Sequence, residues 1–144
     1  MIRIICVGKI KEKYLVSMIE DYYKRVNKYH KLEIIECLDS NIKEEKERLL
    51  SKLNNKSYKV ALCIDGDFLS SVEFSKFIDN KLMNYSNIDF IIGGSNGIDN
   101  EILEMVDYKL SFSKFTFPHG LFRAILLEQI YRSFKILNNE SYHK

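Results

Sequence analysis

Five short apolar stretches divide the chain at fairly regular intervals. The first is IRIICV, in which nearly every residue is apolar or β-branched, and such a run is typical of a buried strand. The predicted strands span residues 2–7, 31–38, 58–65, 88–94 and 108–113. Because these runs are almost continuously apolar, they favour a mostly parallel sheet that is covered on both faces.

The segments between the strands repeat their apolar residues every three or four positions, which predicts amphipathic helices. Ser70 with Glu73 forms a capping box, Asp99 is a capping residue, and Pro118 suits the first position of a helix. The predicted helical segments are 11–29, 39–55, 69–85, 99–106 and 118–139. Alternating strands and helices over 144 residues predict a single α/β domain, residues 1–144, with helices on both faces of the sheet.

The last predicted helix is apolar around well over half of its circumference. Its apolar residues are Leu121, Phe122, Ile125, Leu126, Leu127, Ile130, Tyr131, Phe134, Ile136 and Leu137. A helix of this kind must be buried on more than one side. One side can rest on the sheet, and we expect the other to meet a partner subunit.

Charge is unevenly distributed along the chain, although the net charge is only +2. Residues 1–31 carry +5, residues 32–108 carry −7 and residues 109–144 carry +4. Basic ends around an acidic middle indicate a polarised surface that attracts polyanions, although solvated helix faces explain the same pattern. Lys9, Lys11 and Lys13 form a basic run that extends such a surface or decorates a helix start.

The composition excludes several classes of protein. No apolar run approaches the length of about 20 residues that spans a bilayer, and the first residues lack the pattern of a signal peptide, so we expect a cytoplasmic protein without a membrane segment. Cys6, Cys37 and Cys63 lie in strand-like runs and are expected to be buried, reduced thiols. The three histidines are far apart, so no metal site is expected.

Three strand ends carry the candidate chemistry: LCIDGDFLSS, IIGGSNG and LSFSKFTFPH. In a parallel sheet these ends lie at one edge, so their loops can converge on a pocket. The glycines do not match a dinucleotide fingerprint, and the chain has neither a P-loop nor a nucleophile elbow. They are interpreted either as tight turns or as a backbone cradle for an adenosine-like ligand. SFSKFTF alternates polar and aromatic residues, which fits a strand or a ligand-binding loop.

Several of these segments also occur together in one family. CVGKIKEKY near the start, then IIGGSNG, LSFSKFTFPH, Arg123, EQIYRSFKI and the terminal YHK follow one another in that family's order. In these segments the chain resembles the bacterial SPOUT-class 23S rRNA (pseudouridine-N3)-methyltransferases. The resemblance implies a trefoil-knotted α/β domain, S-adenosylmethionine as methyl donor, a homodimer, and a pseudouridine of the large-subunit rRNA in the assembled ribosome as substrate. Asp67 departs from the family, in which a lysine is common at this position.

The resemblance also assigns roles to individual residues. The implied cofactor contacts are Leu62, Gly93, Gly94, Phe112, Ser113, Lys114, Phe115, Thr116 and Phe117. The expected RNA contacts are Arg123, Arg132, Tyr142, His143 and Lys144, in which cations meet phosphate and the aromatic ring stacks on a base. His143 and Arg132 are the catalytic candidates, and the C-terminal tail is expected to complete the site of the neighbouring subunit.

The sequence leaves open which group accepts the N3 proton of the base. His143 is one candidate and the carboxylate of Glu128 is the alternative, although Glu128 also suits an ion pair with Arg132 four residues on. His119 is a candidate cap of the last helix. Two other functions compete with a methyltransferase: a noncatalytic RNA-binding module with the same basic ends, and a nucleotide-dependent oxidoreductase, which lacks its glycine fingerprint here.

Overall fold

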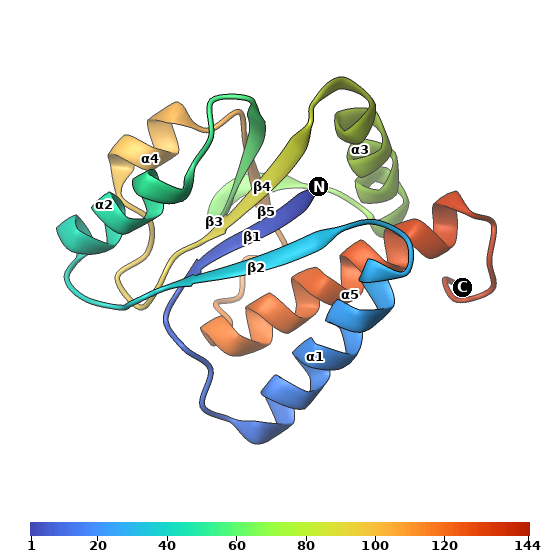
Figure 1. Ribbon diagram of the computed structural model, residues 1–144, viewed down its shortest axis with the longest axis horizontal. Helices are drawn as coiled ribbons and strands as arrows, with labels where there is room; N and C mark the ends of the chain where they lie inside the picture. The colour runs from blue at the N-terminus through green and yellow to red at the C-terminus, as the bar shows by residue number, and fades with distance from the viewer.

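The structure is a computed structural model that describes residues 1–144, in which five strands alternate with five helices (Figure 1). The elements are β1 (Ile2–Val7), α1 (Lys13–Asn27), β2 (Leu32–Cys37), α2 (Ile42–Lys52), β3 (Ser57–Phe68), α3 (Ser71–Asn84), β4 (Asn87–Ile92), α4 (Asn100–Met105), β5 (Tyr108–Ser111) and α5 (His119–Leu137). Every predicted strand and helix is present. The predicted boundaries differ from the observed ones by a few residues, because helix and strand ends depend on contacts outside the local pattern.

The strands form one sheet in the order β2-β1-β4-β3-β5, and every pair of neighbours is parallel. The α/β class and the parallel sheet predicted from the apolar runs are therefore confirmed. Because all five strands point the same way, the loops that follow them lie at a single edge of the sheet. This arrangement sets up the candidate site.

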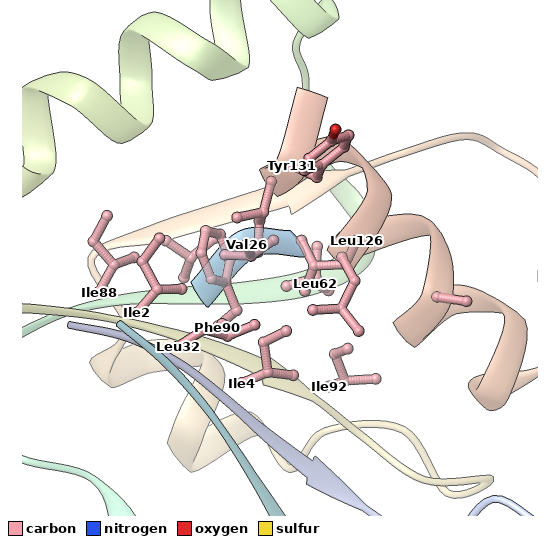
Figure 2. Close-up of a cluster of buried hydrophobic side chains, with 14 of the residues drawn as sticks. Ile2, Ile4, Val26, Leu32, Leu62, Ile88, Phe90, Ile92, Leu126 and Tyr131 are labelled. Carbon is pink, nitrogen blue, oxygen red and sulfur yellow. The ribbon is translucent and has the colours of Figure 1, made fainter. Parts of the chain in front are cut away.

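Helices cover both faces of the sheet, as predicted. Alternate residues of β1 show the division: Ile4 points into a larger core beneath α1, α3 and α5, whereas Ile5 points into a smaller core beneath α2 and α4. Figure 2 shows the larger core, where side chains from the sheet meet Val26 of α1 and Leu126 of α5. Phe90 of β4 lies among them and is fully buried.

Helix α5 is buried within its own chain on several sides. It packs on the sheet and lies between α1 and α3, and Leu126, Leu127 and Ile130 are fully buried there (Figure 1). The neighbouring helices therefore account for much of the apolar circumference that the sequence pattern assigns to a partner subunit. The apolarity of this helix does not by itself require a second copy of the chain.

The end of β3 differs from the prediction. The apolar pattern predicts an end at residue 65, but the strand continues to Phe68, and its pairing with β5 shifts register between Leu62 and Asp67. Gly66 makes this possible, because a Cβ there would lie only 2.6 Å from the carbonyl carbon of Leu110. The extra segment thus runs close against β5, a long-range contact that the local pattern does not contain.

The segment after β5 is a loop. β5 ends at Ser111, so residues 112–117 connect it to α5 without regular structure, which decides between the two interpretations of the alternating pattern in favour of a loop. Pro118 is the N-cap of α5 rather than its first residue, and no side chain caps the helix there. The suggestion that His119 caps α5 is therefore wrong; His119 is the first helical residue.

Candidate active site

A cavity of about 270 Å³ lies at the carboxyl ends of β4 and β5, beside the part of β3 where its pairing with β5 shifts register. It is lined by Leu62, Cys63, Ile64, Ile92, Gly93, Gly94, Gly97, Ile98, Leu103, Ser111, Phe112, Ser113, Phe115, Thr116, Phe117, His119 and Phe122. The three loops singled out in the sequence therefore converge, as the parallel sheet predicts. The lining is mostly apolar with a few hydroxyl groups, which is the usual make-up of a small-molecule site.

The glycine loop after β4 forms one wall of the cavity and leaves no room for a side chain at Gly93 or Gly94. A Cβ on Gly93 would lie 2.5 Å from the carbonyl oxygen of Gly97, and one on Gly94 would lie 2.9 Å from a methyl group of Val7. The amide of Gly97 donates to the carbonyl of Gly94 over 3.0 Å, and Gly97 has a φ of +75°, which favours glycine. The loop is thus a tight turn that also presents bare backbone to the cavity.

The loop between β5 and α5 forms the opposite wall. Phe112 stacks on Phe122 of α5 with ring centroids 4.8 Å apart, which gives the cavity a flat aromatic side. The Oγ of Ser113 accepts a hydrogen bond from the amide of Phe115, so the hydroxyl holds the turn. Phe115 itself is 78% exposed at the rim. Lys114 is exposed and does not line the cavity, unlike the other predicted cofactor contacts.

Several lining residues are not among the predicted cofactor contacts, and Cys63, His119 and Phe122 are examples. Cys63 lies on the cavity wall and is only half-buried, whereas Cys6 and Cys37 are buried as expected; all three thiols are free. Burial raises the pKa of the Cys63 thiol, so it is a poor nucleophile. His119 and Phe122 enter the cavity from the first turn of α5. Their contribution depends on how α5 meets the sheet, which no local motif records.

The C-terminal tail forms a second cluster of functional groups against α5. Asn139, with a φ of +54°, turns the chain after the helix, and the last residues fold back. Arg132 and Glu128 form the predicted ion pair at 2.5 Å. The tail joins this pair, because the Tyr142 hydroxyl donates to Glu128 Oε1 over 3.0 Å and Arg132 Nη1 lies 3.0 Å from His143 Nδ1.

The cluster holds its groups in defined protonation states. The hydrogen bond to Glu128 raises the pKa of Arg132, so the guanidinium stays charged. Burial, and then hydrogen bonds with Tyr22 and Glu128, raise the pKa of Tyr142, so its phenol stays neutral and donates. Glu128 thus accepts hydrogen bonds from two predicted site residues, Arg132 and Tyr142. Its carboxylate is better explained as a structural acceptor than as a free catalytic group. Lys144, the last predicted RNA contact, is exposed.

The cavity and the tail cluster lie at opposite ends of α5. Phe122 lines the cavity and Arg132 binds the tail, and the step of ten helical residues from one to the other corresponds to a separation of about 15 Å. Figure 1 shows the C-terminus beyond the far end of α5. One chain therefore does not bring His143 or Arg132 to its own cavity.

Arg123 occupies a third position. It is buried, pairs with Glu36 at 2.5 Å and donates to the carbonyl of Gly8 over 3.0 Å. It borders a second hollow of about 390 Å³ that Lys9 and Lys11 also line and that shares His119 with the first cavity. Lys13 begins α1 and does not line this hollow. Two nitrogens of the Arg123 guanidinium are thus committed to contacts within the chain, whereas its buried Nε has no hydrogen-bond partner.

Membrane-spanning helices and metal-binding groups are both absent from the structure. No helix in the structure has the length and apolarity that crossing a bilayer requires. No group of three or more histidine, cysteine, aspartate or glutamate side chains is arranged to hold a metal ion.

Comparisons with known proteins agree with this geometry. The profile of the family described as "Predicted SPOUT methyltransferase" matches residues 1–143. The chain is 52% identical to the "Ribosomal RNA large subunit methyltransferase H" of Clostridium kluyveri and 48% identical to that of Carboxydothermus hydrogenoformans, with 99% of each chain covered in both cases.

The structure also resembles a "probable methylase family protein" from Haemophilus influenzae Rd KW20, with a TM-score of 0.59 and 12% identity over 99% of this chain and 70% of that one. This likeness extends to the fold alone. The profile and the close relatives cover nearly the whole chain and confirm the resemblance drawn from its motifs. The chain belongs to the SPOUT methyltransferase family.

Proposed function

We propose that the protein methylates ribosomal RNA of the large subunit, with S-adenosylmethionine as the methyl donor. Its family and the names of its close relatives support this activity. The observation that carries the proposal is the cavity between β3 and the carboxyl ends of β4 and β5, where bare glycine backbone faces an aromatic wall. The specific target in this proposal is N3 of a pseudouridine in the assembled ribosome.

The residues of the cavity suit S-adenosylmethionine. Leu62, Phe112 and Phe117 provide apolar surface for an adenine ring, and the backbone of Gly93 can approach the ligand closely because no side chain intervenes. When bound, the cofactor supplies an activated methyl group on a sulfonium. The chain has only to position the acceptor in line with that group and to help remove its proton.

The residues of the tail cluster suit the RNA side of the reaction. Arg132 keeps its charge and can bind phosphate, and the Tyr142 ring can stack on a base that has left its helix. His143 is exposed beside Arg132 and is the candidate acceptor of the N3 proton. Glu128 is the weaker candidate, because its carboxylate already accepts hydrogen bonds from Gln129, Arg132 and Tyr142.

A homodimer can bring the cavity of one chain and the tail cluster of the other together. Since the tail lies about 15 Å along α5 from the cavity of its own chain, the proposed reaction needs a second subunit to bring its tail to that cavity. We therefore propose a composite site, with the cofactor held by one subunit and the RNA-binding tail supplied by the other. The trefoil knot, a single domain over residues 1–144 and a cytoplasmic location belong to the same proposal.

Labelled S-adenosylmethionine tests the function. The protein is incubated with the labelled cofactor and either assembled ribosomes or free subunits, and the position of the label in the RNA is mapped. We expect label at N3 of one pseudouridine of the large-subunit rRNA, in assembled ribosomes only. Label in free large subunits would contradict the assembly requirement, and label at another base would contradict the target.

Removal of residues 141–144 tests the role of the tail. We expect methylation to be abolished while cofactor affinity and the dimer are largely retained, because none of these residues lines the cavity and their side-chain hydrogen bonds are to α1 and α5. Cofactor affinity is measured by calorimetry and the dimer by sedimentation. Unchanged turnover in the shortened protein would refute the role of the tail.

A further inference from the structure

Glu45 is a buried carboxylate that belongs to neither the cavity lining nor the tail cluster. It lies in the first turn of α2, where its side chain points back toward the start of the helix, and the residue is only 3% exposed. Its Oε2 accepts a hydrogen bond from the amide of Ser40 over 2.8 Å. Its Oε1 is buried and has no hydrogen-bond partner.

The unpartnered oxygen faces the glycine loop of the cavity. A Cβ built on Gly94 would lie 3.5 Å from Glu45 Oε1 and 2.9 Å from the Val7 side chain, so the carboxylate lies beside Val7 against the backbone of Gly94, which lines the cavity. A second contact fixes the same two segments, because Asn96 Nδ2 donates to the carbonyl of Ser40 over 3.0 Å. The carboxylate is thus held behind the wall of the cavity rather than on a mobile surface.

No positive side chain compensates this carboxylate. None of the ion pairs in the chain includes Glu45, and the neighbouring Lys46 pairs with Glu101 instead. Burial of an unpaired carboxylate costs stability, so a partner that arrives with a ligand would recover part of that cost. No lysine, arginine, aspartate or glutamate lines the cavity itself, and Glu45 is a buried carboxylate held against its glycine wall.

We propose that Glu45 sets the preference of the cavity for a positively charged ligand. This inference rests on the proposed function, in which the ligand carries a sulfonium before methyl transfer and a neutral thioether afterwards. The unpaired carboxylate attracts the sulfonium across one layer of backbone, where the effective dielectric is well below that of water. It therefore favours the methyl donor over the spent product, and product release becomes easier once the charge is gone.

The test compares Glu45→Gln with the unaltered protein. Glutamine keeps the shape of the side chain and an acceptor for the Ser40 amide but removes the charge. Calorimetry measures the dissociation constants of S-adenosylmethionine and S-adenosylhomocysteine for each protein. We expect the variant to bind S-adenosylmethionine on the order of tenfold more weakly, as for a charge interaction at an effective dielectric of about 20, and to bind S-adenosylhomocysteine with little change.

Glu44→Gln is the matched control. Glu44 is the preceding residue of α2 and loses the same charge, but its side chain is 50% exposed and pairs with Arg48. We expect the ratio of the two dissociation constants to stay at its original value in this variant. An equal change of the ratio in both variants would overturn the proposal, because it would reflect net charge rather than the place of Glu45.

Other outcomes also decide the matter. Equal weakening of both ligands by Glu45→Gln would overturn the proposal and leave Glu45 as a support of the loop only. If Glu45→Gln fails to fold, the same two dissociation constants are measured for the unaltered protein and for Glu45→Asp. The proposal is overturned if the unaltered protein binds S-adenosylhomocysteine more tightly than S-adenosylmethionine by more than about threefold. The proposal is supported if Glu45→Asp, which keeps the negative charge, still prefers S-adenosylmethionine as the unaltered protein does. If the unaltered protein binds neither ligand, the proposed function fails first.

Discussion

The most buried charge pair of the molecule joins Arg3 of β1 to Asp89 of β4. Arg3 Nε and Nη2 donate to the two carboxylate oxygens of Asp89 over 2.8 and 2.6 Å, and Asp89 is 0% exposed. The hydrogen bond raises the pKa of Arg3, so its charge is permanent. Because this pair lies at the amino-terminal ends of the strands, away from the cavity, it serves stability rather than chemistry.

Asp89→Ala is therefore expected to lower the free energy of unfolding by about 3–5 kcal/mol, the usual cost of leaving one member of a buried pair alone. Urea denaturation measures the change. Asp21→Ala is the control, since Asp21 pairs with Arg25 at the surface, and its loss should cost less than about 1 kcal/mol. Similar losses of unfolding free energy in the two variants would show that the buried Arg3–Asp89 pair contributes no more to stability than a surface pair.

His30 gives the fold a dependence on pH. Its ring stacks on Phe134, its Nε2 is buried without a partner, and burial, followed by the positive N-terminus, lowers its pKa. The ordinary pKa of a histidine is about 6.5, so below this pH the unfolded chain binds a proton that the folded chain does not yet bind. The stability of the fold therefore falls as the pH drops from about 6.5 through the lower pKa of the folded state.

We expect His30→Phe to remove this contribution. Melting temperatures of the two proteins between pH 7.5 and 5 provide the measurement, and the unaltered protein should lose more of its stability than the variant over about the lower half of that range. Phenylalanine can keep the stacking on Phe134. Parallel curves for the two proteins would mean that His30 accepts a proton equally well in the folded state.

At the scale of elements, the strands β1 and β3 show where a local pattern is sufficient and where it fails. The strand β1 is predicted at residues 2–7 and is found there, because its apolar run is buried on both faces and needs no further information. The extension of β3 to Phe68 depends on a register shift against β5, some forty residues later in the chain. Long-range pairing of this kind leaves no periodic trace in either segment.

Gly66→Ala tests the importance of that extension. Its Cβ would meet the backbone of Lys109 and Leu110 at 2.6–2.7 Å, so the end of β3 must move away from β5. Since β5 leads directly into the loop that lines the cavity, we expect both a loss of about 1–3 kcal/mol in unfolding free energy and weaker binding of S-adenosylmethionine. Asp65→Ala, one residue earlier, should change neither by much, and equal effects of the two variants would contradict this account.

At the scale of the molecule, the sequence predicts the cavity but not its relation to the tail. The convergence of three loops follows from parallel strands, so the strand pattern alone is enough to assign Gly93 and Phe112 to one pocket. The position of the tail depends on the length of α5 and on the turn at Asn139. Glu45 escapes prediction for a similar reason, because only the packing of α2 beside the glycine loop makes an ordinary helix glutamate unusual.

The separation of cavity and tail makes the proposed composite site testable by complementation. One variant, Gly93→Val, disrupts the glycine wall of the cavity but keeps its tail, because a Cβ at this position would lie 2.5 Å from the Gly97 carbonyl oxygen. The other lacks residues 141–144 but keeps its cavity. Each variant alone should be inactive, whereas randomly mixed dimers should recover about a quarter of full activity, since half the dimers are mixed and each has one complete site.

The mixed dimers can be isolated with two different affinity tags, and each variant's melting temperature shows whether it is folded. Purified mixed dimers should then have about half the activity of the unaltered protein, with one working site in two. If the tail served the cavity of its own chain, both sites of the mixed dimer would be defective and no activity would return. Inactive mixed dimers made of two folded chains would therefore exclude the exchange of tails, and the distance along α5 would need a rearrangement within one subunit to bridge it.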